Sequence, residues 1–282
     1  MEKHTDRILE LKSIYYSYHN ADGETPAITD LSFSVNESEF IAIVGPSGCG
    51  KSTLLSLISG LITPEKGLIK INGRSLRESA ANIGYMLQHD QLFEWRTIYH
   101  NVLLGLEIQH TLSARTREKA HELLDTYGLK QFENSRPSEL SGGMRQRAAL
   151  VRTLILEPDI LLLDEPFSAL DYQTRLRVGD DIGQILKKEK KTAILVTHDL
   201  SEAISLADRI IILTSRPATV PSSRTPTYNF PPLQFAKAMI SFLISSTITS
   251  FNSTVSLSWK IMQSAPLPLF DSILMNRFRF VK

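Results

Sequence analysis

A glycine-rich loop that follows a short apolar run constrains this chain more than any other feature of its sequence. Residues 45–53 read Gly-Pro-Ser-Gly-Cys-Gly-Lys-Ser-Thr and come directly after the apolar residues 40–44. Glycines let backbone amides turn toward phosphate oxygens where side chains would collide, and a helix that begins near Lys51 points its free N–H groups at the same anion. We expect the lysine to reach the β- and γ-phosphates, and Ser52 to offer its hydroxyl to Mg²⁺. The sequence therefore predicts a nucleoside triphosphate site formed by Gly45, Pro46, Ser47, Gly48, Cys49, Gly50, Lys51, Ser52 and Thr53.

Apolar runs of strand length alternate with stretches of helical periodicity in the first three quarters of the chain. Such runs, apolar on both faces, are typical of strands in a covered parallel sheet; they occur at residues 40–44, 160–163, 193–196 and 209–213. Nearer the N-terminus, Leu31, Phe33 and Val35 alternate with polar residues, which favours an antiparallel strand. The rhythm of strand, loop, helix and strand predicts an α/β fold.

Two carboxylates follow the apolar run at residues 160–163. Asp164 and Glu165 stand at the predicted strand end, where burying both without a partner would be costly. A magnesium–nucleotide complex supplies such a partner, because open α/β sheets bind ligands outside the carboxyl ends of their strands. We expect Asp164 to hold Mg²⁺ and Glu165 to polarise the water that attacks the γ-phosphate. The alternative is a pair of helix-capping acids after a core strand.

Three further segments narrow the prediction beyond a general nucleotide site. Residues 140–147, Leu-Ser-Gly-Gly-Met-Arg-Gln-Arg, open a helix with a glycine-containing turn, which is a second possible anion cradle. Asp171 follows the acidic pair by a few residues, and His198 follows the run at 193–196. Taken singly, the turn at Ser141 could be a helix cap and His198 a satisfied turn residue.

In this order the motifs resemble the nucleotide-binding subunit of an ATP-binding-cassette (ABC) transporter, over residues 8 to about 216. The resemblance implies a P-loop NTPase of the α/β class, with an antiparallel β subdomain and a helical subdomain inserted at about residues 89–140. It implies ATP hydrolysis coupled to transmembrane transport, with ATP and Mg²⁺ as cofactors. It also implies that Tyr18 stacks on adenine, although Tyr15 and Tyr16 lie close by and could take its place.

The resemblance completes the set of predicted site residues. Gln88 matches a glutamine that touches Mg²⁺, His198 a switch that senses the γ-phosphate, and Asp171 an aspartate that acts across a dimer. The predicted catalytic residues are Lys51, Gln88, Glu165 and His198, and the predicted Mg²⁺ ligands are Ser52, Gln88 and Asp164. Nucleotide contacts are predicted for the loop at residues 45–53 and for Tyr18, Ser141, Gly142, Gly143 and Asp171.

The family architecture implies the partners of the chain. Two copies would pack head to tail as a homodimer, each ATP lying between one phosphate loop and the other copy's Leu-Ser-Gly-Gly turn. Two integral-membrane permease subunits would dock on this dimer at the cytoplasmic face of the membrane, and an extracytoplasmic solute-binding protein would take part indirectly. Residues 91–98 and 214–218 resemble the branch that imports nitrate, sulfonates or taurine. Trp95, in the first of these segments, is either a packing residue or a permease contact.

Composition excludes several other classes of protein. The chain of 282 residues has a formal charge of +1, which argues against a general nucleic-acid partner. Its one cysteine, Cys49, excludes an intrachain disulfide and a cysteine-rich zinc site. No apolar run is long enough for a membrane span, and the N-terminus has no secretory pattern. Two alternatives remain open, namely a soluble ABC ATPase that moves no solute and a regulatory module without turnover.

The last part of the chain departs from the family pattern. Residues 217–282 contain no glycine, seven of the 13 prolines, six basic residues and one acid. We therefore expect an ABC ATPase domain at residues 1–216 and an atypical tail at 217–282. The tail is consistent with a disordered extension, with a shift of reading frame, or with an appendage that binds a membrane or partner.

Overall fold

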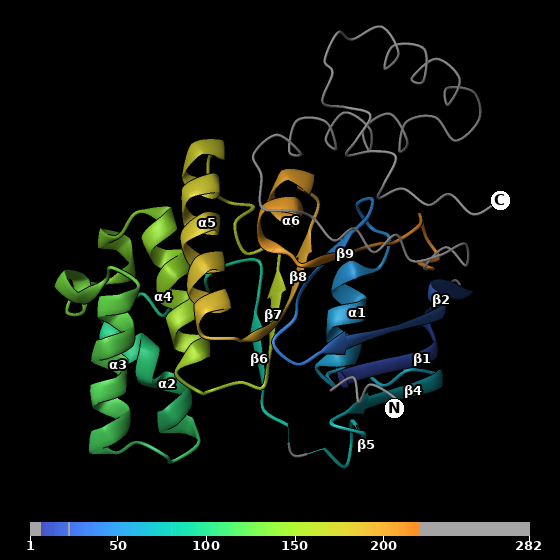
Figure 1. Cartoon of the computed structure of the whole chain (residues 1–282), viewed down its shortest axis with the longest axis horizontal. Helices are drawn as coiled ribbons and strands as arrows, with labels where there is room; N and C mark the ends of the chain where they lie inside the picture. The colour runs from blue at the N-terminus through green and yellow to red at the C-terminus, as the bar shows by residue number, and fades with distance from the viewer. Residues whose placement is uncertain (1–6, 22, 80, 220–282) are drawn as a thin grey trace, which may run out of the picture. The chain divides into compact units, whose positions relative to one another are not determined.

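The computed structural model describes residues 7–21, 23–79 and 81–219. The sequence predictions about the tail, apart from its first three residues, lie outside this part of the chain. Two sheets and the helices around them make up the described fold (Figure 1). The described residues include no helix that is both long and apolar enough to cross a bilayer.

A five-stranded parallel sheet forms the centre of the fold. Its strand order is β6-β7-β8-β3-β9, and β3, β7 and β8 are buried along their whole length. The apolar runs of the sequence become four of these strands, because residues covered on both faces are all apolar. The bounds are β3 Phe40–Val44, β6 Ile83–Met86, β7 Ile160–Asp164, β8 Thr192–Thr197 and β9 Arg209–Ile212.

An antiparallel sheet lies beside the parallel one, in the order β2-β1-β4-β5. Along β2, the alternation of Leu31, Phe33 and Val35 with polar residues places the apolar side chains in the core, as the sequence predicts. This core also contains one face of α1 and residues of the parallel sheet, and α1 lies between the two sheets in Figure 1. The bounds are β1 Arg7–Asn20, β2 Gly23–Asn36, β4 Lys66–Ile71, β5 Arg74–Ser75 and α1 Lys51–Ile58.

A group of helices lies at the other side of the parallel sheet, on the left of Figure 1. Helix α4 packs against α2, α3, α5 and β6, and so joins this group to the sheet. Helices α2 and α3 fall within the insertion expected at residues 89–140, whereas α4 begins just after it. The bounds are α2 Ile98–Ile108, α3 Ala114–Thr126, α4 Gly142–Leu154 and α5 Tyr172–Lys188, with short 3₁₀ helices at Lys130–Phe132 and Pro137–Glu139. Helix α6, Leu200–Leu206, packs instead against β3, β8 and α5.

The last described residues continue the fold beyond the boundary expected at residue 216. Ala218 is buried; its N–H donates to the Ala27 carbonyl at 2.9 Å, and its carbonyl accepts from Thr29 N–H at 3.0 Å. The division into a domain at 1–216 and a tail at 217–282 stays a prediction. A truncation that preserves these contacts has to end after Thr219.

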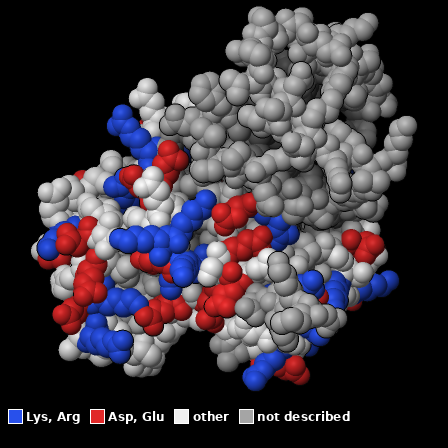
Figure 2. Space-filling view, viewed as in Figure 1, with Lys and Arg blue, Asp and Glu red and all other residues white. Residues whose placement is uncertain are grey.

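Charged side chains of both signs are interspersed on the face of the described residues shown in Figure 2. Several charged side chains of the described residues form ion pairs, such as Arg147 with Asp181 at 2.6 Å and Arg96 with Glu107 at 2.7 Å. This distribution agrees with the near-zero formal charge of the sequence.

Candidate functional site

The loop after β3 has the backbone shape that its glycines predict. Gly48 and Gly50 have φ values of 74° and 115°, which side chains of L-residues disfavour. A Cβ at Gly45 would lie 2.9 Å from Cys49 Sγ and 3.1 Å from the Leu213 carbonyl oxygen. Helix α1 begins at Lys51 with no side-chain cap, so its first N–H groups are free to meet an anion.

Lys51 reaches back into this loop. Its Nζ donates to the carbonyls of Gly45 at 2.9 Å and Pro46 at 3.0 Å, and the residue is only 6% exposed. A buried ammonium is costly unless it is paired, and two neutral carbonyls leave its charge unbalanced. The loop therefore suits a phosphate, because an anion would supply the opposite charge. Cys49 is also buried here, and its burial raises the pKa of the thiol.

Asp164 ends β7 and lies next to the start of α1. The Ser52 hydroxyl donates to Asp164 Oδ1 at 3.2 Å, and the Tyr85 hydroxyl donates to Oδ2 at 3.4 Å. Burial raises the pKa of the Asp164 carboxyl in spite of these hydrogen bonds. A divalent cation would favour the charged form, and a carboxylate beside a hydroxyl offers the oxygen ligands that Mg²⁺ prefers. Ser52 and Asp164 therefore fit the metal that the sequence predicts.

Glu165 follows in an unusual backbone conformation. Its φ is 44°, in the left-handed region, and its N–H donates to the Val196 carbonyl at 2.9 Å. Its Oε2 lies 3.0 Å from His198 Nδ1 at the end of β8. The two residues are 33 positions apart in sequence, and neighbouring parallel strands bring them together. The pair predicted to act on the γ-phosphate is thus in direct contact.

Tyr18 is the tyrosine of β1 that reaches the phosphate loop. Its hydroxyl lies 2.9 Å from Thr53 Oγ1, and its ring is 44% exposed. Tyr16 packs its ring edge-on against Tyr18 and lies against the core, and Tyr15 faces Lys66. Of the three candidates, the geometry therefore favours Tyr18 as a surface for a base.

These elements enclose a cleft of about 310 Å³. Gln88, just after β6, enters it, and its Nε2 lies 3.4 Å from Ser168 Oγ, which in turn donates to the Glu165 carbonyl. The volume is in the range of small-molecule sites. The lining consists of Tyr18, Ala27, Ser47, Gly48, Gly50, Lys51, Ser52, Thr53, Gln88, Asp164, Glu165 and Arg216.

The second predicted anion-binding turn, at the start of α4, does not line this cleft. Among the described residues, Ser141, Gly142, Gly143 and Asp171 are absent from its lining. Ser141 and Asp171 cap the first turns of α4 and α5, accepting from Met144 N–H at 3.4 Å and Thr174 N–H at 3.0 Å. Both are exposed, so a second molecule could reach them. One chain assembles only part of the predicted site, and the residue roles stay predictions.

Sequence reasoning missed one residue that lines the cleft, Arg216, and two that hydrogen-bond to its lining residues, Tyr85 and Ser168. Tyr85 bonds to Asp164, Ser168 bridges Gln88 to Glu165, and Arg216 lies 5.9 Å from the centre of the Tyr18 ring. Arg216 could not be found from local patterns, because its place depends on the chain returning to β2 after β9. Tyr85 could have been found from the sequence, because it lies just before Gln88 near a strand end.

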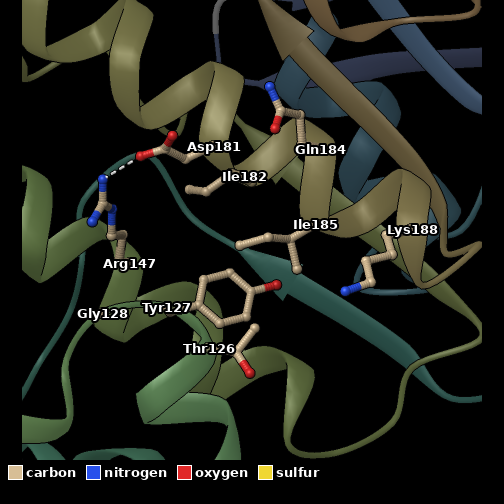
Figure 3. Close-up of a pocket in the computed structure, with 9 residues that line it drawn as sticks. All are labelled: Thr126, Tyr127, Gly128, Arg147, Asp181, Ile182, Gln184, Ile185 and Lys188. Carbon is tan, nitrogen blue, oxygen red and sulfur yellow. Dashed lines mark hydrogen bonds and ion pairs between the residues drawn. The ribbon is translucent and has the colours of Figure 1, made fainter.

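A second, separate cleft of about 370 Å³ lies between the α3–α4 region and α5 (Figure 3). Tyr127 forms part of its wall, and the Arg147–Asp181 ion pair crosses one side of it. Its described lining contains none of the predicted site residues, so this second cleft does not mark the predicted chemistry.

The fold and the loop after β3 define a P-loop nucleotide-binding protein. Residues 28–168 match the family model described as ABC transporter. The chain belongs to this family.

Its relatives include several ATP-binding proteins of transporters. An uncharacterized ABC transporter ATP-binding protein of Bacillus subtilis, YtlC, is 49% identical over 75% of this chain and 82% of its own length. The aliphatic sulfonates import protein SsuB of Bacillus licheniformis is 43% identical over 70% and 76%. The nitrate import protein NrtD of Synechocystis is 39% identical over 79% and 83%.

A solved structure agrees with this assignment. The dimeric structure of MJ0796, a bacterial ABC transporter cassette, is 31% identical, with a TM-score of 0.66 over 76% of this chain and 96% of that one. The predicted fold class is therefore confirmed.

Proposed function

We propose that this chain is the ATP-hydrolysing subunit of a membrane importer for a small solute such as nitrate, a sulfonate or taurine. The observation that carries the proposal is the contact of Glu165 with His198 beside the phosphate loop. It sets a carboxylate and an imidazole at one edge of the sheet, next to the residues suited to hold a triphosphate. The names of the nitrate and sulfonate relatives support the kind of solute.

The residues divide the work of hydrolysis among them. Tyr18 stacks on the base, the amides of residues 45–53 surround the phosphates, and Lys51 exchanges its two carbonyl partners for phosphate oxygens. Ser52, Gln88 and Asp164 would hold Mg²⁺, which would supply positive charge to neutralise the phosphates. Glu165 orients the attacking water and accepts its proton. His198 steadies Glu165 and the departing γ-phosphate.

Two copies complete the site. The helix starts at Ser141 and Asp171 are exposed and stand outside the cleft of their own chain, so a partner copy can bring its Ser141 and Gly143 to the bound ATP. A head-to-tail pair with two identical sites is a closed twofold dimer. ATP then holds the dimer together, and hydrolysis releases it.

The permease subunits dock on the helices that follow Gln88, at the cytoplasmic face of the membrane. Trp95 supports this placement, because it is 71% exposed and stacks on Phe93 at a centroid distance of 4.6 Å. Exposed aromatic residues of this kind are frequent anchors of interfaces. An extracytoplasmic solute-binding protein would deliver the solute to the permease.

An uptake experiment tests the function as a whole. Cells that carry wild-type protein or Lys51→Ala are given labelled nitrate, taurine and an alkanesulfonate in turn. Loss of uptake of one solute in the variant supports the proposal and names the solute. Equal uptake of every solute by both strains contradicts it and favours an ABC ATPase that moves none of them.

A further inference from the structure

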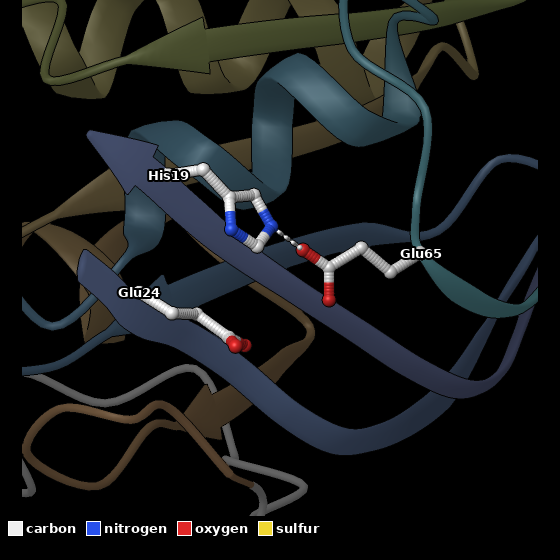
Figure 4. Close-up of side chains that lie close together, drawn as sticks. All are labelled: His19, Glu24 and Glu65. Atoms are coloured by element: carbon white, nitrogen blue, oxygen red, sulfur yellow. Dashed lines mark hydrogen bonds and ion pairs between the residues drawn. The ribbon is translucent and has the colours of Figure 1, made fainter. Parts of the chain in front are cut away.

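Three potential metal ligands meet on the antiparallel sheet, outside the nucleotide cleft. His19 and Glu24 are directly paired across β1 and β2, and Glu65 lies at the end of the loop before β4. One ligand atom from each lies within 4.8 Å of the other two, and His19 Nε2 is 3.0 Å from Glu65 Oε1. Figure 4 shows the imidazole directed at Glu65, with the Glu24 carboxylate extended toward the same space.

A buried serine outside this cluster holds both carboxylates in place. Ser17 is 7% exposed. Its N–H donates to Glu65 Oε1 at 3.0 Å, and its hydroxyl donates to Glu24 Oε1 at 2.7 Å. Glu65 N–H also donates to the Tyr15 carbonyl at 2.9 Å. Outer hydrogen bonds of this kind orient the ligands in metal sites.

The net charge of the cluster suits a cation. Two carboxylates and a neutral imidazole carry a charge of about −2, matching a divalent ion. Imidazole with carboxylate suits zinc and its first-row neighbours, whereas Mg²⁺ and Ca²⁺ prefer oxygen ligands alone.

We propose that His19, Glu24 and Glu65 bind a divalent first-row transition cation, such as Zn²⁺. The bound ion joins β1 and β2 to the loop before β4. His19 lies on β1, the strand that also carries Tyr18. Any effect on the nucleotide through Tyr18 rests on the proposed function, whereas the cation site does not.

Calorimetric titration of the full chain with Zn²⁺ tests the site, with Mg²⁺ present throughout to occupy the carboxylates of the nucleotide cleft. His19→Asn and Glu65→Gln are compared with wild type; glutamine can still accept from Ser17. His110→Asn is the matched control, because His110 is exposed, lies outside the cluster and has a positive φ that asparagine tolerates. We expect the two cluster variants to bind Zn²⁺ at least tenfold more weakly, about the loss seen when metal sites lose supporting residues, and the control to match wild type. Equal affinity in His19→Asn and wild type, or equal loss in the control, overturns the site.

Amide hydrogen exchange, measured in the absence of nucleotide, tests whether the ion connects the three segments. Zn²⁺ should slow amide exchange at residues 15–25 and 62–68 in wild type and leave it unchanged in His19→Asn. Protection of neither segment in zinc-loaded wild type would overturn the proposal that the ion connects them.

Discussion

At the scale of single residues, Glu165 stands out because its backbone is strained while its side chain is well placed. A non-glycine residue with a φ of 44° costs about 1–3 kcal/mol and persists only where the surroundings enforce it. Here the hydrogen bond to Val196 and the contact with His198 enforce it. The strain directs the carboxylate toward the cleft, where hydrolysis would need it.

Glu165→Gln is expected to bind ATP normally and to hydrolyse it about 10²–10⁴ times more slowly, the usual contribution of a general base. Glutamine keeps the size of the side chain and accepts no proton. Nucleotide binding and steady-state phosphate release are measured on the same preparation. Glu122→Gln, on the exposed side of α3, is the control. Turnover at the wild-type rate in Glu165→Gln would remove this residue from the chemistry.

Glu202 makes the stability of the fold depend on pH. It is buried behind β8, bonds to the Thr197 hydroxyl, and lies near Arg175, Asp199 and Glu165. Burial raises its pKa from 4.5 to about 7, so the folded state binds the proton more tightly than the unfolded state. The free energy of unfolding therefore falls as pH rises from about 4.5 to about 7, by at most about 3 kcal/mol.

Glu202→Gln removes this fall, because the amide stays neutral at every pH. Urea unfolding at about pH 5 and about pH 8 should show that the variant gains stability relative to wild type at the higher pH. The exposed control Glu122→Gln should follow wild type. A constant difference between Glu202→Gln and wild type at both pH values would show that the buried carboxyl does not titrate in this range.

At the scale of elements, α4 is tied to the loop that carries Gln88. The Arg152 guanidinium donates to the carbonyls of Gln91 at 2.6 Å and Asp90 at 2.7 Å. Arg145, on the same helix, lies 3.4 Å from the Asp90 carboxylate. Because α4 begins at the Leu-Ser-Gly-Gly turn, these bonds connect the two parts of the predicted site that do not touch directly.

Arg152→Lys should weaken this connection. Lysine has no planar fork to reach both carbonyls, and the loss of one such hydrogen bond costs about 0.5–1.5 kcal/mol. The melting temperature and the rate of ATP hydrolysis should both be lower in Arg152→Lys than in wild type. Arg115→Lys, at an exposed position on α3, should change neither quantity. Unaltered stability in Arg152→Lys would mean that water satisfies the carbonyls as well as the guanidinium does.

Gly143 lies where α4 packs closely against α5, whereas Gly179 has ordinary space around it. A Cβ at Gly143 would lie 3.1 Å from both Thr174 Cγ2 and Val178 Cγ2, whereas one at Gly179 meets nothing nearer than 3.9 Å. In Gly143→Ala these two methyl groups would have to move by a few tenths of an ångström, and we expect this crowding to lower the melting temperature. Gly179→Ala should raise stability by up to about 1 kcal/mol through helix propensity. Calorimetric melting of both variants checks the opposite signs, and a loss of stability in Gly179→Ala would contradict the packing argument.

The same elements show how far sequence alone can predict. Strand runs such as residues 193–196 were identifiable because burial on both faces leaves a continuous apolar signal. Glu165 and His198 were each expected at a strand end beside the nucleotide, and they meet because neighbouring parallel strands end at one edge of the sheet. The arrival of Arg216 at Tyr18 and the bonds from Arg152 to residues 90 and 91 depend on long-range packing. No local pattern encodes such contacts.

At the scale of the whole molecule, the proposed site needs two copies of the chain. Among the described residues, Ser141 is exposed and is absent from the lining of the cleft that contains Lys51. In a head-to-tail dimer, each ATP would need Lys51 from one copy and Ser141 from the other. A copy damaged at Lys51 and a copy damaged at Ser141 should therefore form one working site when they pair. A site formed within one chain would not allow this rescue.

Mixing two inactive variants tests this arrangement. Lys51→Ala damages one half of each site, and Ser141→Arg places a bulky charge in the other half at an exposed position. Each variant alone should hydrolyse little ATP. A mixed dimer contains one site with both natural halves, so equal mixing should restore part of the wild-type rate, up to about one quarter if pairing is random in a symmetric dimer. The rate is measured across mixing ratios and should peak at equal amounts, with Glu122→Gln mixed with Lys51→Ala as the control for dilution. A mixture that is no more active than the average of its two components would show that ATP is hydrolysed without the partner's helix, and the dimeric site would have to be abandoned.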